Sequence, residues 1–248
     1  MCKHCLAHGP ALRHEGLSRR SLVVFSAAAA AAAAIAPMDA IAAKAKAVPK
    51  PQNVLSPDAA LDRLMKGNSR YVKGNSHRHD FAHEREALSG GQNPFAAMLS
   101  CADSRIAPEY CFDTARGDLF VCRVAGNFAS DEIVASLEYA VVVLNTPLIL
   151  VLGHEACGAV DATIKSLKDG STLPGHLPSL VAAIKPAVEG VQDQDGDVLT
   201  KAICRNVTLN VEKLKTTAPI LSAAAGDKKI SVVGGVYKLR TGRVELLS

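Results

Sequence analysis

The sequence predicts an α/β fold, in which α-helices flank a central, mostly parallel β-sheet and a helical arm lies on the N-terminal side. Short, continuous apolar runs at residues 95–100, 119–124 and 148–152 are typical of strands that are covered on both faces. Between the second and third runs, apolar side chains in residues 131–144 recur at helical spacing. A strand, a helix and a strand in this order imply a right-handed crossover, which makes the sheet parallel.

The composition is that of an ordinary globular protein. The chain has 248 residues, of which 48% are hydrophobic and 21% charged, so it is long enough to bury a substantial core. The formal net charge is +4, but five of the 28 Lys/Arg and only two of the 24 Asp/Glu lie in residues 1–45, so the remainder is close to neutral. A near-neutral body with few aromatics and no basic tract argues against a nucleic-acid partner.

The N-terminal segment has the pattern of a cleavable export signal. Arg19 and Arg20 directly precede an alanine-rich apolar run at residues 22–36, and an Ala-x-Ala pattern follows at 43–45 or 45–47. The paired arginines predict the twin-arginine route, and therefore a periplasmic or otherwise exported protein. The run is too short and too rich in alanine to be a stable membrane span. An uncleaved anchor and an alanine-rich tail remain alternatives.

These patterns divide the chain into an export signal at residues 1–45, a flexible leader at 46–55 and a single domain at 56–248. Cys2 and Cys5 form a CxxC pair with nearby histidines, which could hold a metal. The pair precedes the export signal and would be removed with it, so we do not expect it in the mature protein.

The domain begins with a predicted helix. Ser56 has the character of an N-cap, with proline and aspartate after it, and Leu61, Leu64 and Met65 continue an apolar stripe. The charged stretch at residues 77–86 is expected to be helical until the glycine pair at 90–91, with its histidines on a solvated face.

The C-terminal half is predicted to supply the other covering helices and the last strands. Helices are expected at residues 157–167, 177–188 and 198–215. Two strands at 230–237 and 243–247 should then pair around a turn.

Residues whose side chains can bind a metal or take part in catalysis follow two of the predicted strands. Cys101, Asp103 and Arg105 lie in the run CADSR that ends the first apolar run, and His154 and Cys157 follow the third. Ligands collect beyond the carboxyl ends of parallel strands, which brings these residues to one edge of the sheet. Taken singly, a buried thiol, a core histidine and an Asp–Arg turn pair would each explain them.

Taken together, Cys101, His154 and Cys157 form a possible Cys₂His metal site. Cys157 would begin a helix, where backbone N–H groups favour a thiolate. Three protein ligands with a fourth position open are typical of catalytic zinc, whereas structural zinc commonly uses four. The carboxylate of Asp103 could ligate, orient a water molecule or be held by Arg105.

The paired motif of CADSR, followed about fifty residues later by HxxCG, resembles the β class of carbonic anhydrases. Segments between and beside the motifs, at 108–109, 117–127 and 136–141, share the likeness, which covers essentially the whole mature chain. The resemblance implies that residues 56–248 are a zinc-dependent catalytic domain that reversibly hydrates carbon dioxide to bicarbonate and a proton. It also implies one Zn²⁺ per chain, bound by Cys101, His154 and Cys157.

The same resemblance implies further roles. Asp103 and Arg105 would form the catalytic dyad. Gln92 would reach the substrate across a dimer interface, the Gly158 amide would position substrate and Phe120 would lie in the apolar wall. The protein would then be a homodimer or a homotetramer. Members that are switched off by bicarbonate often carry tryptophan shortly before the first cysteine, where this chain has Met98, so an open site is expected.

Other functions remain open from the sequence. The same fold and metal could hydrolyse a carbon dioxide analogue such as carbon disulfide or carbonyl sulfide, or the domain could bind zinc without catalysis. Three cysteines of the domain lie outside the proposed ligand set: Cys111, Cys122 and Cys204. They are expected to be free, buried thiols, and a disulfide among them is an alternative. Four histidines are candidate proton shuttles: His77, His79, His83 and His176.

Overall fold

The computed structural model describes residues 54–247. The predicted export signal, most of the leader and the Cys2–Cys5 pair lie outside these residues. The described part contains five strands, in chain order β1 (Ala96–Ser100), β2 (Leu119–Arg123), β3 (Leu148–His154), β4 (Ser231–Tyr237) and β5 (Val244–Leu247).

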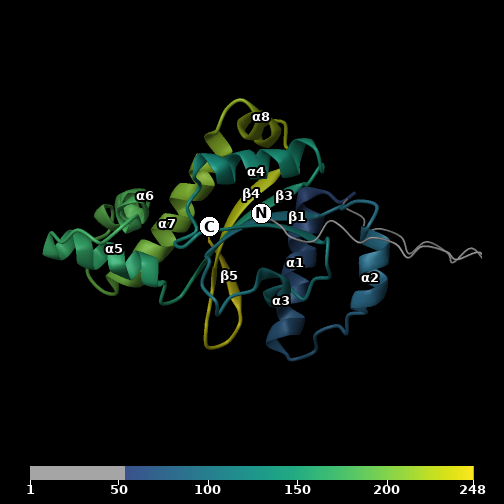
Figure 1. Cartoon of the computed structure of the whole chain (residues 1–248), viewed down its shortest axis with the longest axis horizontal. Coiled ribbons are helices and arrows are strands. Elements are labelled where there is room, and N and C mark those ends of the chain that lie inside the picture. Colours follow the sequence, from purple (N-terminus) through teal and green to yellow (C-terminus); the bar gives the residue numbers. More distant parts are fainter. Residues whose placement is uncertain (1–53, 248) are drawn as a thin grey trace, which may run out of the picture. The chain divides into compact units, whose positions relative to one another are not determined.

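One sheet contains all five described strands, in the order β2-β1-β3-β4-β5. Figure 1 labels β1, β3, β4 and β5 of this sheet. Strands β2, β1, β3 and β4 run parallel to one another, and β5 runs antiparallel to β4. The predicted α/β fold with a mostly parallel sheet is therefore confirmed. Eight helices are described: α1 (Pro57–Val72), α2 (Phe81–Leu88), α3 (Pro108–Cys111), α4 (Asp131–Val142), α5 (Gly158–Asp169), α6 (Leu177–Glu189), α7 (Val198–Thr216) and α8 (Ile220–Gly226).

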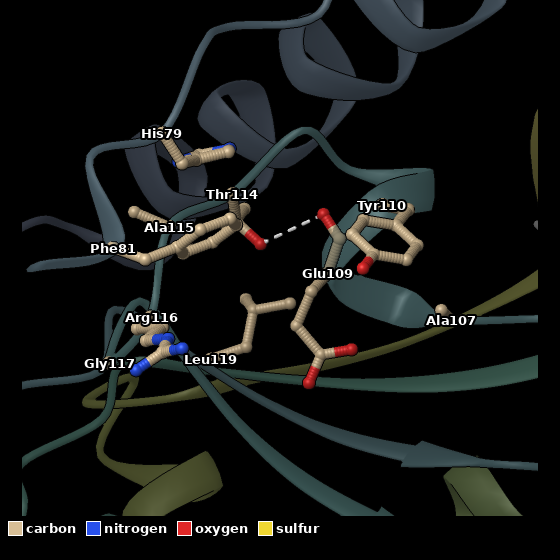
Figure 2. A pocket seen from close by; sticks show the side chains of 10 residues that line it. All are labelled: His79, Phe81, Ala107, Glu109, Tyr110, Thr114, Ala115, Arg116, Gly117 and Leu119. Carbon is tan, nitrogen blue, oxygen red and sulfur yellow. Dashed lines mark hydrogen bonds between the residues drawn. The ribbon is translucent and has the colours of Figure 1, made fainter. Parts of the chain in front are cut away.

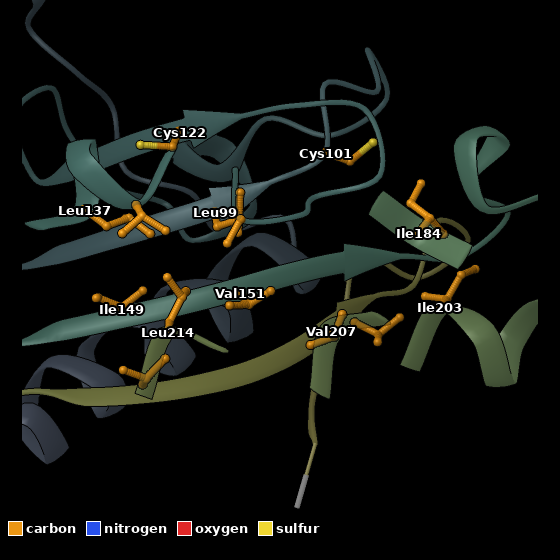
Figure 3. Close-up of a cluster of buried hydrophobic side chains, with 14 of the residues drawn as sticks. Leu99, Cys101, Cys122, Leu137, Ile149, Val151, Ile184, Ile203, Val207 and Leu214 are labelled. Carbon is orange, nitrogen blue, oxygen red and sulfur yellow. The ribbon is translucent and has the colours of Figure 1, made fainter. Parts of the chain in front are cut away.

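The sheet separates two hydrophobic clusters, because successive side chains of a strand point to opposite faces. On β1, Ala97 and Leu99 belong to the cluster that is covered by α4, α6 and α7, whereas Ala96 and Met98 belong to the one that is covered by α1 and α3. Figure 3 shows the first cluster, with Cys101 beyond Leu99 at the carboxyl end of β1.

Helix α7 lies unusually close to the sheet. A Cβ atom at Gly153 would lie 2.6 Å from Val207, and one at Gly234 would lie 2.7 Å from the same side chain. Real Cβ atoms do not approach this closely, so glycine is required at both places for α7 to pack on β3 and β4. The helix is therefore held firmly beside the strand that ends at His154.

The N-terminal arm differs from the prediction in one segment. Ser56 caps α1 as expected, since its Oγ accepts a hydrogen bond from the Ala59 N–H at 3.2 Å. Residues 73–80, however, are not helical, and only α2 follows. Gly74 adopts a left-handed φ of 71° after the last turn of α1, a conformation that ends helices. The expectation of a helix from residue 77 was therefore wrong.

Other elements agree with the sequence patterns or were missed because they are short. The predicted helices at 157–167, 177–188 and 198–215 correspond to α5, α6 and α7, and β4 and β5 pair as expected. Helices α3 and α8 were not predicted, since four and seven residues show too little periodicity. None of the described helices is long and apolar enough to cross a membrane.

Candidate metal centre

The three predicted ligands converge at the carboxyl ends of two neighbouring strands. Cys101 directly follows β1, His154 is the last residue of β3, and Cys157 is the N-cap of α5. Their ligand atoms all lie within 4.8 Å of one another. All three residues are buried, with exposed fractions of 4%, 0% and 1%. Two thiols and an imidazole this close and this buried form a Cys₂His set that can hold a metal ion.

His154 shows the clearest sign of a missing partner. Its Nδ1 lies 2.8 Å from the backbone oxygen of Glu155, so this nitrogen carries the proton and donates it. The other ring nitrogen, Nε2, is buried and has no hydrogen-bond partner in the described part of the chain. An unpaired buried polar atom is unfavourable by about 1–3 kcal/mol. A neutral imidazole held in this way offers its Nε2 lone pair to a cation, so the residues fit a zinc ion.

The two thiols share one proton, so that Cys101 ionises readily and Cys157 holds its proton. A hydrogen bond from Cys157 lowers the pKa of Cys101 to about 4 against the opposing effect of burial, and a bond from the Gly126 N–H, at 3.3 Å, adds to the lowering. The pKa of Cys157 is raised, because it shares the proton with Cys101 and is buried. A soft divalent cation would replace that shared proton.

Asp103 faces Arg105 and does not enter the ligand set. The Arg105 Nε lies 2.9 Å from Oδ1 of Asp103 and Nη2 lies 2.7 Å from Oδ2, a bidentate pair. The backbone N–H of Arg105 also donates to Oδ1, at 2.9 Å. The Arg105 guanidinium holds the pKa of Asp103 well below its ordinary value, so this carboxylate is ionised and can only accept hydrogen bonds.

The Asp103–Arg105 pair also lies beside the three candidate ligands. Oδ2 of Asp103 is 3.8 Å from Nε2 of His154. The Nη2 of Arg105 donates a second hydrogen bond, of 3.1 Å, to the backbone oxygen of Ala156. Arg105 therefore links the loop that carries Cys101 to the turn that carries Cys157.

Arg123 supports the first ligand loop and was not identified from the sequence. Its side chain donates to three backbone oxygens, those of Cys101 at 2.9 Å, Asp103 at 2.8 Å and Ile106 at 2.9 Å. A charged residue at the end of an apolar strand was the only signal, and it did not identify the partners.

The three predicted substrate-binding residues differ in their places. Gly158 directly follows Cys157 at the start of α5, where an added Cβ atom would meet nothing within 4 Å, so its backbone is open to a small ligand. Phe120 lies on β2, with its ring 6.1 Å from that of Tyr139. Gln92 is exposed in the loop before β1, at the opposite end of this strand from Cys101. Its predicted role from across a dimer interface stays a prediction.

The remaining candidates do not join the metal centre within this chain. His77 contacts Asp113 at 2.8 Å, and His79 contacts Glu84 at 3.1 Å with only 22% of its side chain exposed, so it is not on a solvated face as expected. His176 is the N-cap of α6, and the side chain of His83 lies outside the described part.

The described cysteines are all free; Cys111 and Cys122 are buried and Cys204 is half-buried.

A cavity of about 510 Å³ lies elsewhere in the fold (Figure 2). Its lining includes Gly117 and Leu119 at the start of β2, together with Glu109 and Tyr110 of α3. Because Leu119 pairs with Ala96 at the first residue of β1, the cavity is at the end of the strands remote from Cys101. It is therefore not part of the metal centre.

Comparisons with known proteins agree with this geometry. The family model described as carbonic anhydrase matches residues 96–244. A carbonic anhydrase of Mycolicibacterium smegmatis is 38% identical over 199 residues, which cover 78% of this chain and 94% of that protein. The solved β-carbonic anhydrase CcaA is 27% identical, with a TM-score of 0.58, and the match covers 76% of this chain and 95% of that one. A tetrameric β-carbonic anhydrase of Sordaria macrospora, 23% identical over 76% of this chain and 96% of its own, shares the fold with a TM-score of 0.60.

Proposed function

Since this chain belongs to the β-carbonic anhydrase family, we propose that it reversibly hydrates carbon dioxide to bicarbonate and a proton, using zinc bound by Cys101, His154 and Cys157. The observation that carries the proposal is the buried Cys₂His set, with the unpaired Nε2 of His154 beside the Asp103–Arg105 pair. When bound, zinc supplies a Lewis acid that lowers the pKa of water from about 16 to about 7, so that a nucleophile forms near neutral pH.

Asp103 orients the attacking oxygen. As an ionised carboxylate it accepts a hydrogen bond from the O–H of the nucleophile, and this directs an oxygen lone pair toward the carbon. In the reaction one C–O bond forms, one C=O bond becomes a single bond and one proton leaves, so no residue is oxidised or reduced. Arg105 keeps Asp103 ionised and in place, since it donates two side-chain bonds to it.

Three further residues are proposed to act on the substrate. The N–H of Gly158 and the side chain of Gln92 from a second subunit would donate hydrogen bonds to substrate oxygens. Phe120 would contribute apolar surface for carbon dioxide. These roles rest on the family resemblance. Measurement of KM for Gln92→Ala, for Phe120→Ala and for Gly158→Pro, which removes the backbone N–H, would test them.

Two alternative functions have less support. A zinc module without catalysis would not need Asp103 or Arg105, because neither is among the three convergent ligands. Hydrolysis of carbon disulfide or carbonyl sulfide would use the same metal centre, but the matched relatives carry the name carbonic anhydrase. Direct assay of the purified protein with each substrate separates these possibilities.

The test combines metal analysis with stopped-flow measurement of carbon dioxide hydration from about pH 7 to pH 9, where the nucleophile forms. We expect about one zinc per chain and rapid hydration, both of them lost on chelation and restored by zinc. Full zinc occupancy without hydration anywhere in this range would instead support a zinc-binding module.

Assembly and location are further parts of the proposal. Tyr139 and Val142 of α4 and its C-cap Val143 expose about half of their surface, at 47%, 57% and 54%, and an apolar face of this kind is suited to contact between subunits. We propose a homodimer or homotetramer, which light scattering would test.

We also propose export by the twin-arginine route. Replacement of Arg19 and Arg20 by lysine should block export and leave the protein in the cytoplasm, as cell fractionation would measure.

A further inference from the structure

Helix α7 carries two buried asparagines on the face that packs against the sheet. Asn206 and Asn210 are 2% and 7% exposed, among the apolar side chains of Ala202, Ile203 and Val207. Figure 3 shows Ile203 and Val207 of this face beside the strands. Burial of a primary amide is unfavourable unless its hydrogen bonds are satisfied, so the contacts of these two side chains indicate why they are here.

Both asparagines hold the loop that follows β2. Nδ2 of Asn206 donates to the backbone oxygen of Gly126 at 2.8 Å, and Oδ1 of Asn210 accepts from the Ala129 N–H at 2.7 Å. Asn210 also donates to the backbone oxygen of Asn206, at 2.8 Å. Nζ of Lys213 adds a bond of 2.5 Å to the Ala129 oxygen. The polar edge of α7 therefore fixes both ends of residues 126–129.

The same loop contacts a metal ligand. The Gly126 N–H donates to Sγ of Cys101 at 3.3 Å, while the Gly126 oxygen is the atom that Asn206 holds. Gly126 has a left-handed φ of 83°, and a Cβ there would lie 2.4 Å from Ile184, so little freedom remains on that side. If Asn206 were lost, the Gly126 oxygen would lose its partner and the loop could turn its N–H away from the sulfur.

We propose that Asn206 is a positioning residue of the metal centre, which acts through the Gly126 N–H on Cys101. A hydrogen bond to a thiolate draws electron density from the sulfur and fixes its direction, so it sets how strongly Cys101 binds the metal. Asn206 touches neither the metal ligands nor the reacting atoms, and its effect passes through the backbone of one loop. This inference rests on the proposed zinc site.

The experiment compares Asn206→Ala with a matched variant, Asn68→Ala. Asn68 is equally buried, at 3%, and donates to the backbone oxygens of Cys111 and Gly242. It also accepts a bond from the Val244 N–H at 2.9 Å, but it packs on the opposite face of the sheet. The two changes remove the same group, and only one of them is connected to a metal ligand.

Two measurements are made on the full-length protein, and neither depends on activity. The first is zinc affinity by competition with a chromophoric chelator. The second is the sulfur-to-cobalt charge-transfer absorption after Co²⁺ replaces zinc. For Asn206→Ala we expect affinity to fall about tenfold, the lower end of the range for loss of a direct partner of a ligand, because Asn206 acts through Gly126, and we expect the absorption band to shift. For Asn68→Ala we expect thermal stability to fall, with affinity within about twofold of the parent and the band unmoved.

Equal affinities and spectra for the two variants would overturn the inference, as would an Asn206→Ala protein that binds zinc like the parent. Failure of the parent protein to bind zinc would instead overturn the proposed function. Should Asn206→Ala lower the yield of folded protein, Asn206→Ser provides the same test. It keeps a small hydroxyl that is too short to reach the Gly126 oxygen.

Discussion

Two aspartate–arginine pairs of this chain use the same groups in different surroundings. Asp113 is paired with Arg70 of α1 through a bond of 2.5 Å, and its side chain is only 1% exposed. Asp103 is paired with Arg105, two residues away, and its side chain is 17% exposed while that of the arginine is 50% exposed. One pair joins segments that are distant in the sequence, and the other stays within a single turn.

The surroundings explain the difference. Asp113 also accepts a hydrogen bond from the His77 backbone N–H at 2.8 Å. Its carboxylate therefore connects Arg70 of α1, and the segment after α1, to the end of α3. Asp103 instead lies beside Nε2 of His154, which is buried without a hydrogen-bond partner in the described residues and belongs to the Cys₂His set. The comparison indicates that the long-range pair, whose carboxylate is fully hydrogen-bonded, serves the fold, and it is consistent with the proposal that the local pair beside His154 serves catalysis.

The largest expected effect is a loss of zinc affinity, and it follows a change in the metal site beside Asp103. Cys157→Ser should lower zinc affinity by roughly a thousandfold and abolish hydration, since it removes one of the three proposed ligands and replaces a thiolate by a hydroxyl, which is a much weaker zinc ligand. Metal analysis after dialysis measures the loss. Cys122→Ser is the control, because Cys122 is also a buried free cysteine of the same cluster but lies outside the ligand set. Loss of zinc from both variants would contradict the assignment.

In the Arg70–Asp113 pair, Arg70→Met should lower the stability of the fold and leave the hydration rate per bound zinc unchanged. Removal of one partner leaves a buried carboxylate with less compensation, so the free energy of unfolding should fall by about 3 kcal/mol. Urea unfolding measures this change. Lys66→Met, which breaks an exposed pair with Asp62, should change it by less than about 1 kcal/mol. If Arg70→Met also lowered the hydration rate per bound zinc, the claim that the Asp113 pair affects only stability would be contradicted.

Acid should weaken the fold through Asp113. Burial alone would raise the pKa of Asp113, but bonds from Arg70 and His77 outweigh it and place the pKa below the ordinary 3.8. The folded state therefore binds fewer protons than the unfolded state in this range. Its stabilisation is present above about pH 4 and is lost as the pH falls through the lowered pKa. Urea midpoints of the metal-free protein should fall with pH from about 5 to about 2.5, less steeply for Asp113→Asn. Parallel curves for the two proteins would contradict this.

The smallest effect concerns backbone strain near each pair. Asp113 and Ala156 both have a left-handed φ, of 46° and 52°. Aspartate tolerates this region, whereas alanine is strained there. Ala156→Gly should therefore raise the free energy of unfolding by about 0.5–1 kcal/mol, as measured by urea unfolding. A loss of stability would mean that the turn before Cys157 is not strained.

Much of the metal centre could be predicted from the sequence because its residues follow strands. The apolar runs at 95–100 and 148–152 place Cys101 and His154 at strand ends, and parallel pairing brings those ends together. The direction of Asp103, toward Arg105 or toward the ligands, could not be predicted, because it depends on side-chain geometry. The same is true of Arg123 and Asn206, whose backbone partners belong to other elements and leave no local pattern.

The fold shows the same limit. Long periodic helices such as α7 were predicted almost to the residue, since their apolar faces follow from packing on the sheet. Residues 73–80 were not, because a charged stretch is compatible with a helix until a contact such as His77 with Asp113 holds it in another conformation. Tertiary contacts therefore decide the segments in which hydrophobic periodicity is weak.

The most direct test of the account measures zinc content and carbon dioxide hydration together in Asp103→Ala. All three ligands remain, so we expect about one zinc per chain, and a loss of stability below about 1 kcal/mol because the pair is local and partly exposed. Hydration per bound zinc should fall by about 100- to 1,000-fold, since the acceptor that orients the nucleophile is gone. Hydration within a few-fold of the parent at full zinc occupancy would contradict the central claim that Asp103 serves catalysis.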